Sequence, residues 1–138
     1  MAITTPPPTP VTVVGAALII DGRLLAARRR HPPSLAGHWE LPGGKVEPRE
    51  NDVTALAREL REELAIQATI GPLLGRTLIN PTTTLAIYLC THFTGVPTLG
   101  DDHDELRWVN ADNLTDLNWL AADRLLLPVL IPHLTPSP

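Results

Sequence analysis

The sequence predicts an α/β domain in which helices cover a mixed β-sheet. Three observations lead to this fold class. Runs rich in β-branched and alternating apolar residues predict strands on both sides of one strongly helical segment, and an apolar helix follows near the end of the chain. The 138 residues are also enough for one domain with its own core, which we place at residues 11–132.

The first strands are predicted to form a hairpin after a proline-rich start. Residues 1–10 hold four prolines without periodicity, which predicts a disordered arm. Val11–Ile20 is rich in Val, Ile and Ala, and Asp21-Gly22 separates it from a second apolar run at Arg23–Ala27. An Asp-Gly pair between two such runs is a strong hairpin signal. Trp39–Leu41 then predicts a short strand.

The clearest helix is predicted over residues 52–65. The apolar residues that share one face at helical spacing are Val53, Leu56, Ala57, Leu60 and Leu64. Asn51 or Asp52 can cap the first turn, because both side chains accept hydrogen bonds from the free backbone N–H groups there. The helix can therefore pack one face on a core and present its other faces.

The second half of the chain is predicted to form more strands and a last helix. The expected strands are Leu73–Ile79 and Thr83–Phe93, joined by an Asn80-Pro81 turn, and then Leu106–Val109. Ala111–Leu114 predicts one helical turn. Ala121–Ile131 predicts a short helix that must bend or end near Pro128, because proline lacks the N–H that a helix interior needs. Residues 133–138 predict a frayed tail.

Composition and charge exclude several classes of function. The net charge of −4 argues against long DNA or RNA as a partner, although it leaves small anionic substrates open. The longest apolar stretch, Val13–Ile20, is too short to span a membrane, and the N-terminal residues lack the pattern of a signal peptide. We therefore expect a soluble cytoplasmic protein. The single cysteine, Cys90, is expected to pack as a small hydrophobe.

Three glutamates on the predicted helix indicate a divalent cation. Glu59, Glu62 and Glu63 are spaced so that their carboxylates emerge on one helix face. Alone this is unfavourable, because like charges repel and the C-terminal end of a helix disfavours anions. A bound cation would replace repulsion by coordination, and ligands that are all oxygen favour Mg²⁺ first and Mn²⁺ second. A solvated acidic face is the alternative interpretation.

Two neighbouring features are consistent with such a site. Arg58 precedes Glu62 by four residues, so it can pair with that carboxylate and hold it. Gly43 and Gly44 lack Cβ atoms and are expected to turn the chain sharply after Pro42. Such a turn would let a backbone carbonyl approach a metal ion.

Taken together, these residues resemble the signature of the Nudix family of hydrolases. That signature runs from a glycine through a glutamate to an Arg-Glu and a Glu-Glu pair, and it ends on an aliphatic residue. The matching positions are Gly44, Glu50, Arg58, Glu59, Leu60, Glu62, Glu63 and Ile66. Ala65 is the one departure, since the family has glycine there. That position concerns the end of the helix rather than the chemistry.

Further segments resemble the MutT-like branch of this family. They are residues 23–28, 35–45, 102–109 and 118–123, so the resemblance covers residues 11 to about 130. It implies the Nudix fold, which is an α/β/α sandwich around a mixed β-sheet. It also implies the conversion of a nucleoside triphosphate into the monophosphate and pyrophosphate.

The resemblance assigns catalytic roles to several acids. The implied metal ligands are the carbonyl of Gly43 and the carboxylates of Glu59, Glu62 and Glu63. Glu62 is the first choice for the general base, next to Arg58. An acid from a later loop can contribute, and that position falls on Asp102, with Glu105 as the nearby alternative. A solvated loop is the competing interpretation of these two acids.

Basic residues near the glycines are candidates for phosphate binding. Arg28 or Arg29 is expected to contact phosphate through its rigid fork, and Lys45 can also reach it. Surface charge at the end of a strand is the alternative for both arginines. Glu40 is expected to brace the metal shell, unless it is a surface acid.

Asp123 is the candidate for reading the base. A carboxylate accepts a hydrogen bond from an exocyclic amine, and a protonated carboxyl can also donate one. The alternative is that Asp123 caps the last helix. Trp39 and Trp108 are expected in the core, whereas the role of Trp119, close to Asp123, stays open.

Two classes of nucleotide compete as substrate. One is an oxidised purine triphosphate, 8-oxo-dGTP, and the other is a pyrimidine triphosphate such as CTP or dCTP. Residues 80–84 carry no charge, which favours the cytidine-preferring subgroup. A Nudix enzyme that cleaves ADP-ribose or dinucleotides stays open, and so does a Nudix-fold binding module without catalysis. The sequence leaves monomer and homodimer equally open.

Overall fold

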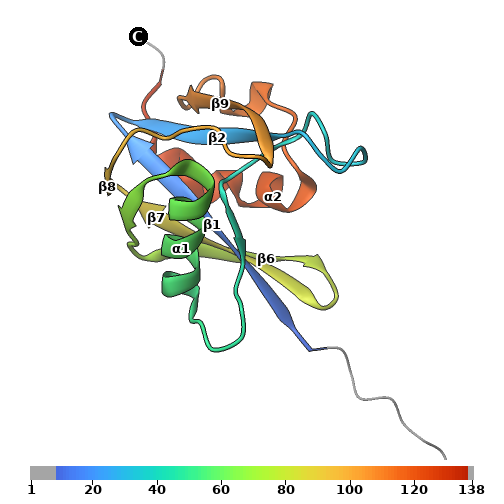
Figure 1. The fold of residues 1–138 in the computed structure, drawn as a ribbon. Coiled ribbons are helices and arrows are strands. Elements are labelled where there is room, and N and C mark those ends of the chain that lie inside the picture. Colours follow the sequence, from blue (N-terminus) through green and yellow to red (C-terminus); the bar gives the residue numbers. More distant parts are fainter. Residues whose placement is uncertain (1–8, 137–138) are drawn as a thin grey trace, which may run out of the picture.

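The computed structural model describes residues 9–136, and its elements follow the predicted alternation of strands and helices (Figure 1). Their bounds are β1 Val11–Ile20, β2 Arg23–Arg29, β3 Trp39–Glu40, β4 Gly43–Lys45, α1 Asp52–Leu64, β5 Gln67–Thr69, β6 Leu73–Asn80, β7 Thr83–Cys90, β8 His92–Thr94, β9 His103–Val109, the 3-10 turn η1 Leu114–Asp116, α2 Ala121–Leu130 and the 3-10 turn η2 Ile131–His133. The predicted disordered arm lies outside the described residues up to residue 8.

Strand β1 is the centre of a mixed sheet. It pairs in parallel with β7 and antiparallel with β2 and β4. The strand order is β3-β2-β1-β7-β6, and β9 adds to β2. The short strands β5 and β8 pair with each other beside this sheet. The prediction of a mixed sheet is therefore confirmed.

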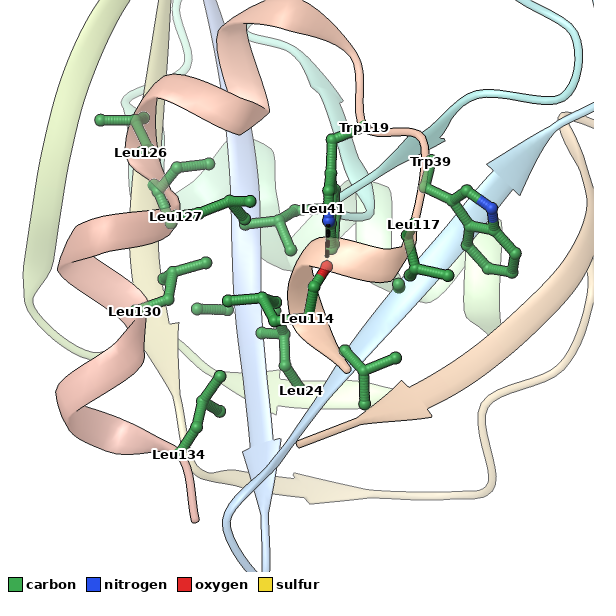
Figure 2. Close-up of a cluster of buried hydrophobic side chains, with 14 of the residues drawn as sticks. Leu24, Trp39, Leu41, Leu114, Leu117, Trp119, Leu126, Leu127, Leu130 and Leu134 are labelled. Carbon is green, nitrogen blue, oxygen red and sulfur yellow. Dashed lines mark hydrogen bonds between the residues drawn. The ribbon is translucent and has the colours of Figure 1, made fainter. Parts of the chain in front are cut away.

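The two helices cover opposite faces of the sheet, because successive side chains of β1 point to opposite sides. Leu56, Leu60 and Leu64 of α1 pack in one core cluster with Val14, Ala16 and Leu18 of β1. Leu126, Leu127 and Leu130 of α2 pack in the other cluster with Ala17 and Ile19, as the close-up of that core shows in part (Figure 2). This is the expected α/β/α sandwich.

The hairpin between β1 and β2 has the turn that Asp-Gly predicts. Asp21 and Gly22 both have positive φ, at 52° and 72°, as a two-residue turn of this kind requires. Thr135 donates its N–H to the carbonyl of Gly22 at 3.0 Å, and Leu134 is buried in the core. Residues 134 and 135 of the predicted tail therefore contact the rest of the domain. The last two residues of the predicted frayed tail, 137–138, lie outside the described residues.

Helix α1 begins and ends as predicted, to within one residue. The Oδ1 of Asn51, its N-cap, accepts a hydrogen bond from the N–H of Thr54 at 2.8 Å. Ala65 ends the helix in the left-handed conformation, with φ 59° and ψ 35°. Alanine thus occupies a backbone geometry that favours glycine.

Several predicted elements differ in their bounds, among them the last strand, which was predicted at Leu106–Val109 and begins at His103. The strand expected at Thr83–Phe93 divides into β7 and β8, because β8 leaves the main sheet to pair with β5. The helical turn expected at residues 111–114 is the 3-10 turn η1, which starts at Leu114. Pro128 lies inside α2, which continues only to Leu130, so the prediction that it ends near the proline is confirmed.

The tryptophans differ in burial. Trp39 and Trp119 are buried, whereas Trp108 is 37% exposed, so the prediction that Trp108 lies in the core is wrong. Among the described residues β9 pairs only with β2, so it is an edge strand whose side chains have fewer neighbours than those of the central strands. Cys90 is buried and unbridged, as expected of a small hydrophobe. Across the residues that the structure describes, neither helix is long and apolar enough to cross a membrane.

Candidate active site

Most of the predicted site residues line one of two cavities. The larger, of about 990 Å³, lies between β4, the loop after β2 and the start of α2, and Gly44 is part of its wall. The smaller, of about 230 Å³, is lined only by acidic residues, which are Glu59, Glu62, Glu63, Asp101 and Asp102. We call the first the large cavity and the second the acidic cavity.

The acidic cavity brings together residues far apart in the sequence. Helix α1 supplies Glu59, Glu62 and Glu63, and the loop before β9 supplies Asp102, as the sequence predicted, together with Asp101, which the sequence analysis did not select. Glu105 lies elsewhere, because it pairs with Arg107 at 2.6 Å. Of the two predicted loop acids, the structure therefore brings only Asp102 to the helix.

Arg58 forms ion pairs with two of the glutamates that line the acidic cavity. Its Nε and NH2 donate to the two carboxylate oxygens of Glu50 at 2.7 and 2.8 Å, and its NH1 lies 3.0 Å from Glu59 and 3.2 Å from Glu62. The predicted pair with Glu62 is therefore present, although Glu50 is the main partner. The hydrogen bond from Arg58 lowers the pKa of Glu50 to about 2. NH2 of Arg58 also donates to the carbonyl of Lys45 at 3.1 Å, which ties α1 to β4.

Gly43 and Gly44 do not form the predicted sharp turn. Both lie in the extended strand β4, and neither has a positive φ. Instead, the glycines let neighbouring groups approach the backbone of β4 closely. A Cβ on Gly43 would overlap the carbonyl of Val14, and a Cβ on Gly44 would overlap the carboxylate of Glu59. Gly43 lines the large cavity rather than the acidic one.

Burial and mutual repulsion make the acidic cavity electrostatically strained. Glu63 is nearly buried, and its pKa is raised to about 9, first by burial and then by the charges of Glu40, Glu59 and Asp102. Burial also raises the pKa of Glu59. A divalent cation would offset these charges, and carboxylate oxygens are the ligands that Mg²⁺ and related hard ions prefer.

The acids of this cavity are the right kind of ligand for such an ion, but their side chains are not yet arranged around one ion position. Within residues 9–136, no three His, Cys, Asp or Glu side chains are already arranged around one ion position. Arg58 engages Glu59 and Glu62, while Glu63 faces a histidine. The space that Gly44 leaves for Glu59 and the all-carboxylate lining both fit a hard cation.

His103, to which the sequence analysis assigned no role, lies behind the acidic cavity. Its Nε2 is 2.8 Å from Glu40 Oε2, and its Nδ1 is 3.2 Å from Glu63 Oε1. Glu40, predicted to brace the metal shell, therefore reaches Glu63 only through this ring. The one available signal was a histidine inside the acidic run from Asp101 to Glu105.

The predicted phosphate-binding residues do not all reach a cavity. Arg29 and Lys45 line the large cavity, and Arg29 donates to Glu40 at 3.1 Å. Arg28 lines neither cavity. It donates to Asp104 at 2.7 Å and lies 5.8 Å from the ring centre of Trp39. The alternative interpretation of Arg28, a charge at the end of a strand, therefore describes it better.

Asp123 is buried in the first turn of α2 and lines the large cavity. Its Oδ2 accepts a hydrogen bond from the backbone N–H of Leu41 at 3.0 Å, and burial raises its pKa to about 7. Leu120 is the N-cap of this helix, so the alternative role of Asp123 as a cap is wrong. Trp119 is a core residue whose Nε1 donates to the carbonyl of Leu114 at 2.7 Å (Figure 2).

The sequence is similar to those of known proteins. A profile of the NUDIX domain matches residues 9–130. A Mycobacterium tuberculosis protein named "Putative 8-oxo-dGTP diphosphatase 2" is 44% identical over 116 residues, which span 81% of this chain and 82% of that protein. The CTP pyrophosphohydrolase of Escherichia coli is 52% identical over 61 residues, which are 44% of this chain and 45% of that enzyme.

Solved structures show the same fold. A MutT NUDIX hydrolase from Burkholderia pseudomallei superposes with a TM-score of 0.78 at 32% identity, and the match covers 93% of this chain and 100% of that one. The solution structure of the E. coli ORF135 protein matches equally well, with a TM-score of 0.78, 32% identity and 90% of each chain. The domain match, the sequence relatives and the fold agree, and this chain belongs to the Nudix family of hydrolases.

Proposed function

We propose that this protein is a divalent-metal-dependent pyrophosphohydrolase of the MutT-like type, which converts a nucleoside triphosphate into the monophosphate and pyrophosphate. One observation carries the proposal: a cavity lined only by carboxylates adjoins a cavity large enough for a nucleoside. The two meet at Gly44, which lines the large cavity and makes room for Glu59 in the acidic one. A triphosphate could therefore lie across this boundary.

The residues of the chain divide the chemistry among them. Glu59, Glu62 and Glu63 would hold Mg²⁺, or Mn²⁺ in its place, and the bound ion supplies charge neutralisation and an activated water. Arg29 and Lys45, on the wall of the large cavity, would contact phosphate oxygens. The water oxygen forms a new bond to the α- or β-phosphorus while the P–O bond of the α–β bridge breaks, and the monophosphate and pyrophosphate separate.

Glu62 is our first choice for the residue that takes the proton from the attacking water. Its side chain is 59% exposed, so water and substrate can reach it, whereas Glu63 is only 6% exposed. Asp102 is the second choice, because it lines the same cavity and is half-exposed. A general base must come within hydrogen-bonding distance of the proton that it accepts.

Asp123 is proposed to read the base in the large cavity. Its carboxyl can accept a hydrogen bond from an exocyclic amine or, when protonated, donate one. The names of the relatives support both CTP and 8-oxo-dGTP as candidate substrates. Because residues 80–84 carry no charge, we propose a cytidine triphosphate first and 8-oxo-dGTP second. The cytoplasmic location stays a prediction.

The test is a panel of nucleoside triphosphates with Mg²⁺, scored for monophosphate and pyrophosphate. We expect pyrophosphate as the first product, and Glu62→Gln should lower kcat by about 100-fold or more. Asp116→Asn, an exposed acid on η1, is the matched control and should retain activity. Orthophosphate as the first product would refute the cleavage position. Turnover of ADP-ribose or dinucleotides alone would indicate the other substrate class, and nucleotide binding without turnover a binding module.

Asp123→Ala tests base reading separately. We expect this change to alter the ranking of the bases, measured as relative kcat/KM across the panel, more than it lowers the highest kcat. The reason is that Asp123 lines the large cavity and lies outside the acidic one. An unchanged ranking would count against its role.

A further inference from the structure

His103 is a buried polar residue that the proposed chemistry does not use. It opens β9, and its side chain is only 1% exposed. Its Nε2 is within hydrogen-bonding distance of Glu40 Oε2, at 2.8 Å. Its Nδ1 lies 3.2 Å from Glu63 Oε1, yet among the described residues it completes no well-aligned hydrogen bond. A buried polar atom without a partner is costly, so such an atom calls for an explanation.

We propose that His103 is a positioning residue that holds the carboxylate of Glu63 in the orientation needed to bind the divalent cation. This inference rests on the proposed function. The Nδ1 atom and Glu63 Oε1 are 3.2 Å apart, which is close enough for a charge-assisted contact between the ring and the carboxylate. Glu63 also lines the acidic cavity, so the carboxylate that His103 contacts is one of the proposed ligands of the ion.

The ring of His103 is itself fixed from the other side. Glu40 engages its Nε2, and Arg29 donates to the same Glu40 oxygen at 3.1 Å. The connected side chains therefore run from Arg29 through Glu40 and His103 to Glu63. A ligand held by an anchored partner loses little freedom when it binds a metal ion, and such partners commonly set both affinity and activity.

The ring also separates two carboxylates. Glu40 and Glu63 are close enough for the charge of one to affect the other, and His103 lies between them with a nitrogen toward each. His103 does not line the acidic cavity, so it acts on the ion through Glu63 rather than as a ligand. The competing interpretation is a core histidine that only stabilises the fold.

Mn²⁺ binding without nucleotide, followed by electron paramagnetic resonance, separates these interpretations. We expect His103→Ala to weaken Mn²⁺ binding by about 10- to 100-fold. His103→Asn, whose amide replaces the Nδ1 side of the ring, should recover part of that loss. His92→Ala, an exposed histidine on β8, is the control and should bind Mn²⁺ as the wild type does.

A double-mutant cycle tests whether the effect passes through Glu63. If His103 acts on the ion by holding Glu63, then His103→Ala should change Mn²⁺ affinity by less than about 3-fold in a Glu63→Gln background. An equally large loss in both backgrounds would overturn the proposal. So would wild-type Mn²⁺ affinity in folded His103→Ala, even if its thermal stability were lower, because that is the result of a purely structural role.

Further variants and the behaviour of the wild type keep the inference distinct from the proposed function. If His103→Ala does not fold, the isosteric Glu40→Gln and His103→Asn replace it, and wild-type Mn²⁺ affinity in both would overturn the proposal. If the wild-type protein binds Mn²⁺ and hydrolyses nucleotides while the His103 variants behave normally, only the positioning role fails. If the wild type itself binds no Mn²⁺ and hydrolyses no nucleotide, the proposed function fails, and the inference fails with it.

Discussion

Asp123 combines a structural hydrogen bond with an unfavourable buried charge. Its carboxyl accepts a hydrogen bond from Leu41, but burial raises its pKa from 3.8 to about 7. Between these two values the folded state binds a proton that the unfolded state has released. The free energy of unfolding therefore falls as pH rises from about 4 to about 7, and the cost is complete above the higher value.

Asp123→Asn should relieve this cost while keeping an acceptor for the N–H of Leu41. We expect the variant to exceed the wild type in free energy of unfolding by about 2 kcal/mol near pH 8, and by little near pH 4. Urea denaturation at both pH values measures the difference. Parallel pH profiles for the two proteins would show that the carboxyl does not carry this cost.

The absence of a Cβ atom at Gly44 leaves room for the Glu59 side chain, which lines the acidic cavity. A Cβ at this position would overlap the carboxylate of Glu59. Gly44→Ala should therefore displace Glu59 and lower metal-dependent turnover by about 100-fold, because small displacements of catalytic groups are costly. Turnover and Mn²⁺ affinity would be measured together with thermal unfolding. Wild-type values for both would mean that Glu59 can move away without consequence.

At the scale of elements, helix α1 ends in a conformation that its residue does not favour. Ala65 has φ 59°, in the left-handed region where a Cβ costs roughly 1–2 kcal/mol. Ala65→Gly should raise the free energy of unfolding by about 1 kcal/mol, as measured by denaturant unfolding. The matched control is Ala57→Gly inside the same helix, which should lower it by about 1 kcal/mol. Two changes of the same sign would contradict this explanation.

Two of the strands, β4 and β8, take conformations that depend on the strands with which they pair. Two of the three residues of β4 are glycines that predicted a turn, yet the strand is extended because it pairs with β1 at Val13, Val14 and Gly15. Likewise β8 separates from β7 because its partner is β5. Local sequence patterns cannot reveal a partner strand that lies elsewhere in the chain, so these elements were misassigned or missed.

At the scale of the whole molecule, a metal ion should stabilise the fold. An ion that binds only the native state adds about 2.7 kcal/mol when its concentration is 100 times its dissociation constant. Mg²⁺ should therefore raise the thermal unfolding temperature of the wild type relative to protein in chelator. A variant with Glu59, Glu62 and Glu63 all changed to Gln should lose this response.

The same triple variant should be more stable than the wild type when no metal is present. Glu63 has its pKa raised from 4.5 to about 9, so near neutral pH the folded state keeps a proton that the unfolded state releases, and this lowers the free energy of unfolding. Neutral amides remove that cost together with the repulsion between the three acids. Thermal unfolding in chelator measures the effect, and an unfolding temperature below that of the wild type would contradict it.

The sequence by itself determined much of this protein. Hydrophobic periodicity predicted the β1–β2 hairpin and α1, because both depend on residues close together in the chain. Helical spacing placed Glu59, Glu62 and Glu63 on one face, and the surrounding signature indicated the family. These features are local, so the pattern alone was sufficient.

Only the tertiary structure decided which residues meet across the sheet. It brought Asp102 rather than Glu105 to the acids of α1, and it turned Arg28 toward Trp39 and away from both cavities. It also placed His103 between Glu40 and Glu63. Each of these contacts joins segments that strand pairing brings together, and the direction of a side chain near a strand end depends on register and bulges that composition does not encode.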